Sequence, residues 1–187
     1  VETMNEKGEG LFKNISVKTI YNTEATKENI IAAIDSLAIQ INPEDVFIFY
    51  YAGHGGVNDG EFYFIPTDNV SLYQKSKLDK SAISATLLQE KFQKIKALKQ
   101  IALLDACHAG ASTEILAQMS RSEGIHVLAA AGSEQQATEF GALGHGVFTY
   151  VLMEAISGKA DGAPKDGKVT IYELISYLDD QVPEISQ

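Results

Sequence analysis

The stretch Val46-Phe-Ile-Phe-Tyr-Tyr-Ala-Gly-His-Gly55 decides how this chain folds, because it runs from an apolar segment straight into glycines. Residues 46–52 are almost wholly apolar, and a second apolar run, residues 101–104, leads into Asp105-Ala-Cys-His-Ala-Gly110. Short apolar runs with polar or glycine-rich boundaries are typical of strands buried on both faces of a parallel sheet. We predict that the two runs form neighbouring parallel strands, joined by a right-handed crossover through the helical stretch between them.

His54 and Cys107 each follow one of these predicted strands. The carboxyl ends of parallel strands form the ligand crevice of open α/β sheets, so we expect the imidazole and the thiol to meet there. A thiol is mostly protonated at neutral pH, and a nearby imidazole raises its thiolate fraction. The pattern therefore predicts a cysteine nucleophile with a histidine base.

Attack of a thiolate on an amide carbonyl builds negative charge on oxygen, which preorganised backbone N–H groups stabilise. Gly55 has no side chain to block approach, so its N–H and that of Cys107 are the candidate donors. Taken alone, a cysteine at a strand end is usually a small buried hydrophobe, and a histidine beside glycines is usually a turn residue. The pairing of the two contexts favours catalysis. We expect no role for the other histidines, which are His108, His126 and His145.

Strands and helices alternate along the rest of the chain, which predicts an α/β fold with a sheet covered on both faces. The expected elements are a strand at 15–20, a helix at 27–41 capped by Thr26, an extended piece at 61–66, a helix from Ser84 to 95, a short helix at 114–119, a strand at 127–131, a helix at 147–156, and a last helix through 178 that follows a Thr170/Glu173 capping box.

Composition sets wide bounds on function. The chain has 187 residues, the length of one domain, and its net charge of −10 argues against nucleic acid and anionic membranes as partners. A basic peptide is attracted by the same charge. The single cysteine excludes an internal disulfide, and no apolar stretch is long enough to span a membrane. With no visible signal peptide, we expect a cytoplasmic location.

Four blocks of sequence resemble a known family. The caspase signature places a histidine about 50 residues before an Ala-Cys pair, and here His54 precedes Cys107 by 107 − 54 = 53 positions. Blocks 50–55, 105–108, 131–137 and 144–150 are similar to those of metacaspases and bacterial caspase-like peptidases. The chain thus resembles the caspase-like cysteine peptidases, the clan of caspases and gingipains.

This resemblance implies a three-layer caspase-like fold, with a mostly parallel central sheet and helices on both faces. It also implies endopeptidase activity through the His54 and Cys107 dyad, with Gly55 as an oxyanion donor. Metacaspase-like enzymes carry an aspartate two residues before the cysteine and cleave after Arg or Lys, which is the place of Asp105 here. An acidic pocket attracts a basic side chain. Ser133 and Glu134, in the third block, are further expected substrate-binding residues.

Asp105 has a second reading, because an aspartate at this place can also cap the following turn through backbone N–H groups. The family's fold opens with a hydrophobic strand, for which residues 1–12 are too polar. We therefore expect a single caspase-like domain at 1–187 that lacks its first strand, either removed or supplied by a separate piece, in what could be a larger multidomain protein.

An Arg/Lys-specific enzyme could clip itself at basic residues in loops, and the candidates are Arg121, Lys75 and Lys77. The loop at 111–124 is short compared with the linker that caspases cut, so we expect activity as an uncut monomer.

We expect the chemistry to need no cofactor and no bound metal. Many metacaspases respond to calcium, and Glu114, Asp68 and Asp59 are acidic residues near the relevant loops, but their spacing is not diagnostic. Residues 162–173 put Gly162 and Pro164 at the first two ligand positions of a calcium loop, which excludes an EF-hand. One cysteine with scattered histidines gives no zinc site.

The sequence thus predicts a cysteine endopeptidase that acts on proteins or peptides with an exposed Arg or Lys. The rival, from a different class, is a protease-like scaffold that binds peptides or partner domains without cleaving them, because a fold alone does not establish activity.

Overall fold

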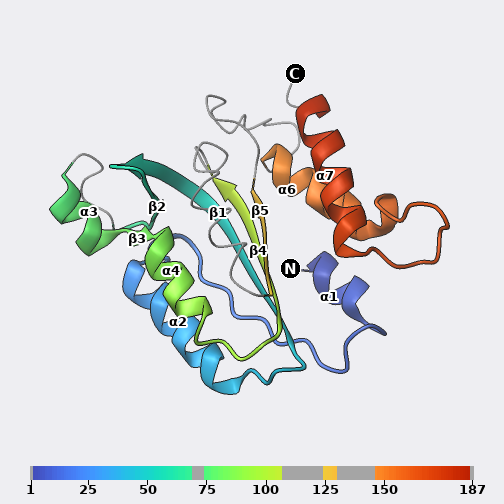
Figure 1. Ribbon diagram of the computed structural model, residues 1–187, viewed down its shortest axis with the longest axis horizontal. Helices are drawn as coiled ribbons and strands as arrows, with labels where there is room; N and C mark the ends of the chain where they lie inside the picture. The colour runs from blue at the N-terminus through green and yellow to red at the C-terminus, as the bar shows by residue number, and fades with distance from the viewer. Residues whose placement is uncertain (1, 69–73, 107–123, 130–145, 186–187) are drawn as a thin grey trace. The chain divides into compact units, whose positions relative to one another are not determined.

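The computed structural model describes residues 2–68, 74–106, 124–129 and 146–185 (Figure 1). The chain divides into two compact units, one made of residues 19–136 and the other of residues 1–18 and 137–187. Each unit is described by itself. Within the described ranges, no helix combines the length and the apolar character needed to cross a membrane.

A five-stranded mixed sheet forms the centre of the 19–136 unit, with the strand order β3-β2-β1-β4-β5. Its strands are β1 (Val46–Asn58), β2 (Glu61–Ile65), β3 (Ile83–Ser84), β4 (Lys99–Ala106) and β5 (Ile125–Ala129). β4 runs parallel to both β1 and β5, whereas β2 pairs antiparallel with β1, and β3 pairs antiparallel with β2. The predicted parallel pair and the predicted α/β class, with a mostly parallel sheet, are confirmed.

β1 is longer than the sequence predicts. The glycines after Ala52 look like a turn, yet the strand continues through His54 to Asn58 and returns as β2 after a two-residue turn. Asp59 and Gly60 form that turn with φ of 50° and 78°, which is the type I′ geometry that suits a twisted hairpin. Pairing with β2 keeps the glycines extended, so His54 lies inside a strand and not beyond its end.

Four helical segments accompany this sheet: η1 (Asn22–Glu24), α2 (Lys27–Gln40), α3 (Lys75–Ser81) and α4 (Ala85–Phe92). The two predicted caps are confirmed. The Thr26 hydroxyl accepts a hydrogen bond from the Asn29 N–H at 3.2 Å, and the Ser84 hydroxyl accepts one from the Leu87 N–H at 3.1 Å. The sequence did not predict α3, because its one buried residue, Leu78, leaves no apolar periodicity to read.

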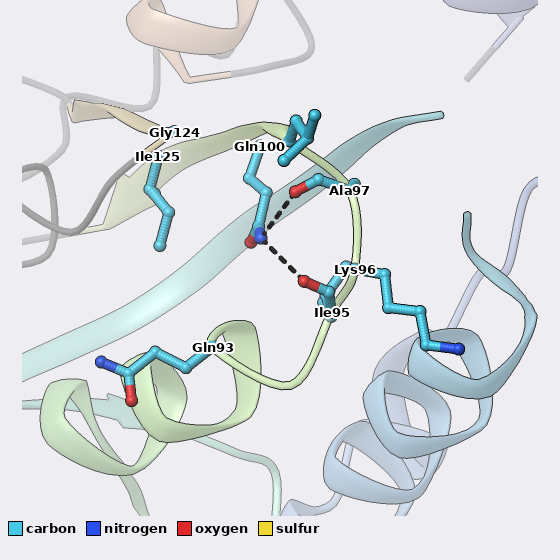
Figure 2. A pocket seen from close by; sticks show the side chains of 8 residues that line it. Gln93, Ile95, Lys96, Ala97, Gln100, Gly124 and Ile125 are labelled. Atoms are coloured by element: carbon cyan, nitrogen blue, oxygen red, sulfur yellow. Dashed lines mark hydrogen bonds between the residues drawn. The ribbon is translucent and has the colours of Figure 1, made fainter. Parts of the chain in front are cut away.

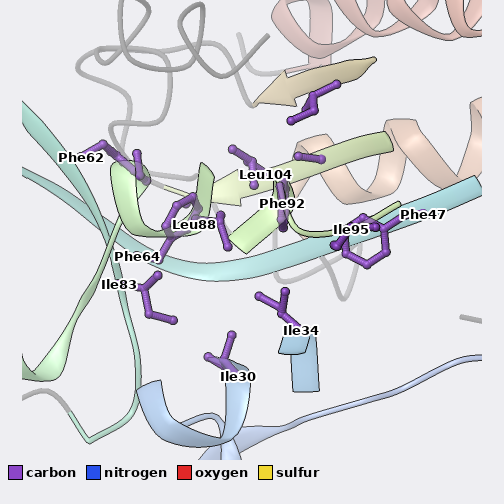
Figure 3. Packing of buried hydrophobic residues seen from close by; sticks show 14 of the residues in the cluster. Ile30, Ile34, Phe47, Phe62, Phe64, Ile83, Leu88, Phe92, Ile95 and Leu104 are labelled. Atoms are coloured by element: carbon purple, nitrogen blue, oxygen red, sulfur yellow. The ribbon is translucent and has the colours of Figure 1, made fainter. Parts of the chain in front are cut away.

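α2 and α4 pack on one face of the sheet and enclose its main hydrophobic core (Figure 3). The Phe92 ring of α4 is fully buried and contacts the Phe47 and Phe49 rings of β1 edge to face, at centroid distances of 5.3 and 5.4 Å. Ile30 and Ile34 of α2 face the same cluster. Because side chains alternate across a strand, odd-numbered residues of β1 and even-numbered residues of β4 form this face.

The predicted outer strand at residues 15–20 is wrong. This segment forms no strand, and its Ile15 and Val17 side chains are 40% and 47% exposed. Alternating apolar residues become a strand only where a second strand takes up their backbone hydrogen bonds, and no described strand pairs with this segment. The predicted helix at 114–119 lies outside the described residues.

A buried glutamine fixes the connection between α4 and β4. Gln100 is 5% exposed, and its Nε2 donates to the carbonyl oxygens of Phe92, Ile95 and Ala97 at 3.3, 3.3 and 3.1 Å. The Phe92 carbonyl also accepts the Ile95 N–H at 3.0 Å, so the Gln100 amide matters most to the Ile95 and Ala97 carbonyls of this turn.

We expect Gln100→Leu to lower the free energy of unfolding by about 1–3 kcal/mol, because it removes the donor from buried carbonyls while keeping a similar volume. Urea denaturation followed by circular dichroism measures this change. Gln93→Leu, at an exposed neighbouring position, is the matched control and should change stability by less than about 0.5 kcal/mol. Equal effects of the two variants would contradict the structural role of Gln100.

The other unit contains α1 (Glu2–Gly8), α6 (Val147–Glu154), the π-helical turn η3 (Ala155–Lys159) and α7 (Ile171–Ile185). α6 packs against α7. The predicted capping box is confirmed: the Glu173 N–H donates to the Thr170 hydroxyl at 3.3 Å, and the Thr170 N–H donates to the Glu173 carboxylate at 2.8 Å. The same carboxylate also accepts the Gly162 N–H at 3.0 Å, which ties the preceding loop to the start of α7.

Hydrogen bonds from the Thr170 N–H, the Thr170 hydroxyl and the Gly162 N–H lower the pKa of Glu173. Its ionised form therefore favours the folded chain at pH values above the ordinary glutamate pKa, and this contribution is lost as the pH falls through the lowered value. We expect Glu173→Gln to lower the thermal unfolding midpoint at neutral pH and to approach wild type in acid. If the wild-type and Glu173→Gln unfolding midpoints differed equally at neutral and at acidic pH, the role of the ionised Glu173 carboxylate would be contradicted.

Candidate active site

The predicted site lies where β1 changes its pairing partner. Along its first part β1 pairs in parallel with β4, and the last pair in this register is Gly53 with Ala106. From His54 onward β1 pairs antiparallel with β2, beginning with Ile65. The His54 side chain is exposed, so it is open to a substrate. Cys107 follows Ala106 in the sequence and lies outside the described residues.

Asp105 is opposite Ala52 in the β1–β4 register and is only 9% exposed. Its neighbours Leu104 and Ala106 belong to the core under α2 and α4, so the alternation of a strand puts Asp105 on the opposite face of the sheet. His54 follows Ala52 by two positions along the same strand and shares that face. The structure thus brings a buried carboxylate and an exposed imidazole to one face at the carboxyl end of the parallel strands.

The Gly55 N–H is directed by the hairpin register. Two-residue turns close on a hydrogen-bonded pair, here Asn58 with Glu61, and hydrogen-bonded and non-hydrogen-bonded pairs then alternate along the ladder. Counting back, the Gly55 and Phe64 pair is non-hydrogen-bonded. The Gly55 N–H therefore points away from β2, toward the side on which β4 pairs with β1.

Tyr51 is the residue near this point that sequence reasoning missed. Its Oη lies 2.8 Å from the His54 carbonyl oxygen and 3.2 Å from the Ile65 carbonyl oxygen, so its one proton is donated mainly to His54 and shared with Ile65. In the sequence Tyr51 is one more apolar residue of a buried strand, and nothing there signals a contact three residues ahead that depends on the β2 pairing.

A comparison with protein families decides the identity of the fold. The model of the caspase domain family matches residues 6–186. The chain belongs to the caspase domain family. A search of curated proteins found no match. Membership supports a cysteine peptidase as the kind of function, with proteins as its substrates.

Two of the predicted self-cleavage residues of this caspase domain lie in a helix. Lys75 and Lys77 belong to α3, and the Lys75 Nζ donates to the Tyr63 hydroxyl at 3.1 Å and lies 3.9 Å from a carboxylate oxygen of Asp79. The third, Arg121, is outside the described residues, as are Ser133, Glu134 and the acidic residue Glu114.

Two of the acidic residues considered for calcium, Asp59 and Asp68, belong to the described part of the caspase domain. Asp59 lies in the β1–β2 turn, and Asp68 accepts a hydrogen bond from the Lys27 N–H at 3.3 Å. Among the residues that the structure describes, no three His, Cys, Asp or Glu side chains come close enough together to hold a metal ion.

A hollow of about 490 Å³ lies at the other end of the sheet (Figure 2). It is lined by Gln100 at the start of β4, by Ile125 at the start of β5, and by the turn after α4. Gln100 pairs with Phe47, six positions before Gly53, so this hollow is at the amino ends of the strands, away from His54.

Proposed function

We propose that this caspase domain is a cysteine endopeptidase that cleaves proteins after Arg or Lys, with Cys107 as the nucleophile and His54 as the base. The observation that carries the proposal is the β1–β4 register. Gly53 of β1 is paired with Ala106 of β4, and His54 and Cys107 are the residues that follow this pair in the sequence. Adjacent parallel strands are about 4.8 Å apart, within reach of a thiol and an imidazole.

In the proposed mechanism His54 takes the proton of the Cys107 thiol, and the thiolate attacks the carbonyl carbon of the scissile amide. The resulting oxyanion accepts hydrogen bonds from the N–H groups of Gly55 and Cys107. When the tetrahedral intermediate collapses, the C–N bond breaks and the leaving amine takes the proton from His54. Water, deprotonated by His54, then hydrolyses the thioester, and the thiol leaves with that proton.

We propose that Asp105 binds the basic side chain of the substrate. Its carboxylate is buried on the same face as His54, two residues before Cys107 in the sequence. A cationic Arg or Lys is attracted by a carboxylate, whereas an acidic side chain is repelled. The net charge of −10 also favours basic substrates. We include Ser133 and Glu134 in the proposed substrate-binding set.

Fluorogenic peptides that end in Arg, Lys or Asp test this function directly, each with and without calcium, beside a Cys107→Ala control. We expect turnover of the Arg and Lys peptides by wild type alone. Turnover of no peptide would favour the non-cleaving scaffold, and turnover of the Asp peptide alone would overturn the assignment of Asp105. A rate that rises with calcium would add a metal requirement that the described residues do not account for.

Self-processing is part of the proposal. Peptidases bind extended segments, so cutting after Lys75 or Lys77 requires α3 to unwind and the Lys75 contact with Tyr63 to break. Mass spectrometry of the purified chain, compared with Cys107→Ala, tests the idea. Identical fragments from both proteins would remove it.

A further inference from the structure

The Tyr51 hydroxyl lies across the point where β1 leaves β4 and begins to pair with β2. It is within 2.8 Å of the His54 carbonyl oxygen and 3.2 Å of the Ile65 carbonyl oxygen, and these two residues are the first antiparallel pair. The Tyr51 ring packs edge to face on the Phe64 ring, with centroids 5.0 Å apart. A packed ring and a doubly engaged hydroxyl fix this side chain at both ends.

The His54 carbonyl and the Gly55 N–H are the two ends of one planar peptide unit. A hydrogen bond to the carbonyl oxygen therefore fixes the direction of the N–H as well. It also draws electron density toward the oxygen, which makes the N–H a stronger donor. The hairpin register directs this N–H away from β2, so the Tyr51 hydroxyl and the Gly55 N–H act at opposite ends of the same group.

Gly53 leaves room for the hydroxyl. A Cβ atom at this position would be 2.9 Å from the Tyr51 Oη and 3.1 Å from its Cζ. Glycine inside a strand lowers stability, and a close approach by another group is a common reason for it. An alanine at position 53 would push the Tyr51 hydroxyl off the two carbonyls.

The Tyr51 hydroxyl also keeps its proton over the whole pH range in which a Cys-His pair works. Burial raises the pKa of Tyr51 to about 12, so the group remains a hydrogen-bond donor there.

We propose that Tyr51 is a positioning residue, which aims and polarises the Gly55 N–H for the oxyanion of the substrate. The proposal rests on the proposed peptidase function and adds a residue to it. Tyr51 touches no reacting atom. It acts through the His54–Gly55 peptide, and Gly53 is the small residue that makes the contact possible.

Tyr51→Phe keeps the ring and removes the hydroxyl. We expect its kcat on an Arg peptide to fall about tenfold, less than the loss of a whole oxyanion donor, with KM within about twofold of wild type. Alkylation of Cys107 by iodoacetamide builds no oxyanion, so its rate should stay at the wild-type value. The control is Tyr63→Phe, which removes the hydroxyl that donates to the Asp79 carboxylate at 2.7 Å and should leave kcat unchanged.

Gly53→Ala is the second variant, and it acts on the same contact from the other side. We expect it to lower kcat by a similar factor, and the double variant to lose no more than either single variant, because both remove one hydrogen bond. Multiplied losses in the double variant would overturn the proposal. So would a slower alkylation of Cys107 in Tyr51→Phe, which would show that the histidine itself had moved.

Wild-type turnover, measured first, distinguishes a failure of the proposed Tyr51 role from a failure of the proposed peptidase function. An active wild type with an equally active Tyr51→Phe overturns the role of Tyr51 and leaves the peptidase function standing. A wild type that cleaves no peptide overturns the proposed function, and the role of Tyr51 with it.

Discussion

His54→Ala is expected to lower kcat/KM for an Arg peptide by about a thousandfold or more, while the chain stays folded. Removing the base leaves the thiol protonated at neutral pH and leaves no group to protonate the departing amine. Because the His54 side chain is exposed at the change of strand pairing, its removal empties no part of the core.

Peptide kinetics measure the loss of kcat/KM, and thermal unfolding measures whether the variant stays folded. His126→Ala is the matched control, since His126 is an exposed histidine on β5 with no assigned role and should retain wild-type rates. A His54→Ala variant that keeps its rate within a few fold of wild type would remove His54 from the mechanism.

Asp105→Asn is expected to lower kcat/KM for Arg and Lys peptides by about a hundredfold or more. Leaving one member of a buried ion pair without its partner costs about 3–5 kcal/mol, and the variant would force a cationic side chain into a neutral pocket. For peptides that carry an uncharged residue in place of this Arg or Lys, kcat/KM should change far less. The control is Asp45→Asn, at the amino end of β1, where Asp45 accepts the Asn42 N–H. It should leave the turnover of both basic and uncharged peptides unchanged.

The same variant separates the two readings of Asp105. Asparagine caps a turn about as well as aspartate, so a capping role predicts a stable and fully active Asp105→Asn protein. A specificity role predicts a stable protein that has lost its preference for basic residues. Comparing the ratio of Arg to uncharged peptide turnover between wild type and variant decides between them.

Those parts of the fold that depend on local pattern could be read from the sequence. The continuous apolar runs 46–52 and 101–104 predicted adjacent parallel strands, and the pairing is confirmed. Burial on both faces does not hold for β1, where Ile48 and Tyr50 are 41% and 42% exposed. Thr26, Ser84 and the pair Thr170 and Glu173 predicted helix starts, because a side-chain cap satisfies N–H groups a few residues away.

The parts that depend on distant pairing could not be read. Residues 15–20 have the alternation of a strand but find no strand partner in the described chain, and α3 forms around a single buried leucine. At the site, the strand ends predicted that His54 and Cys107 would meet at one end of the sheet, and Cys107 lies outside the described residues. The extension of β1 into a hairpin, and with it the contact from Tyr51 to His54, required knowing that β2 would pair there.

The pH dependence of Cys107 alkylation tests the central claim most directly, namely that a thiol and the His54 imidazole form one catalytic pair. The chain has a single cysteine, so iodoacetamide labelling of the intact protein reports on Cys107 alone. We expect wild type to react rapidly well below the ordinary thiol pKa of about 8.5, and His54→Ala to react at that pH only as slowly as a free thiol. Identical profiles for the two proteins, both rising near the ordinary thiol pKa, would contradict the pairing.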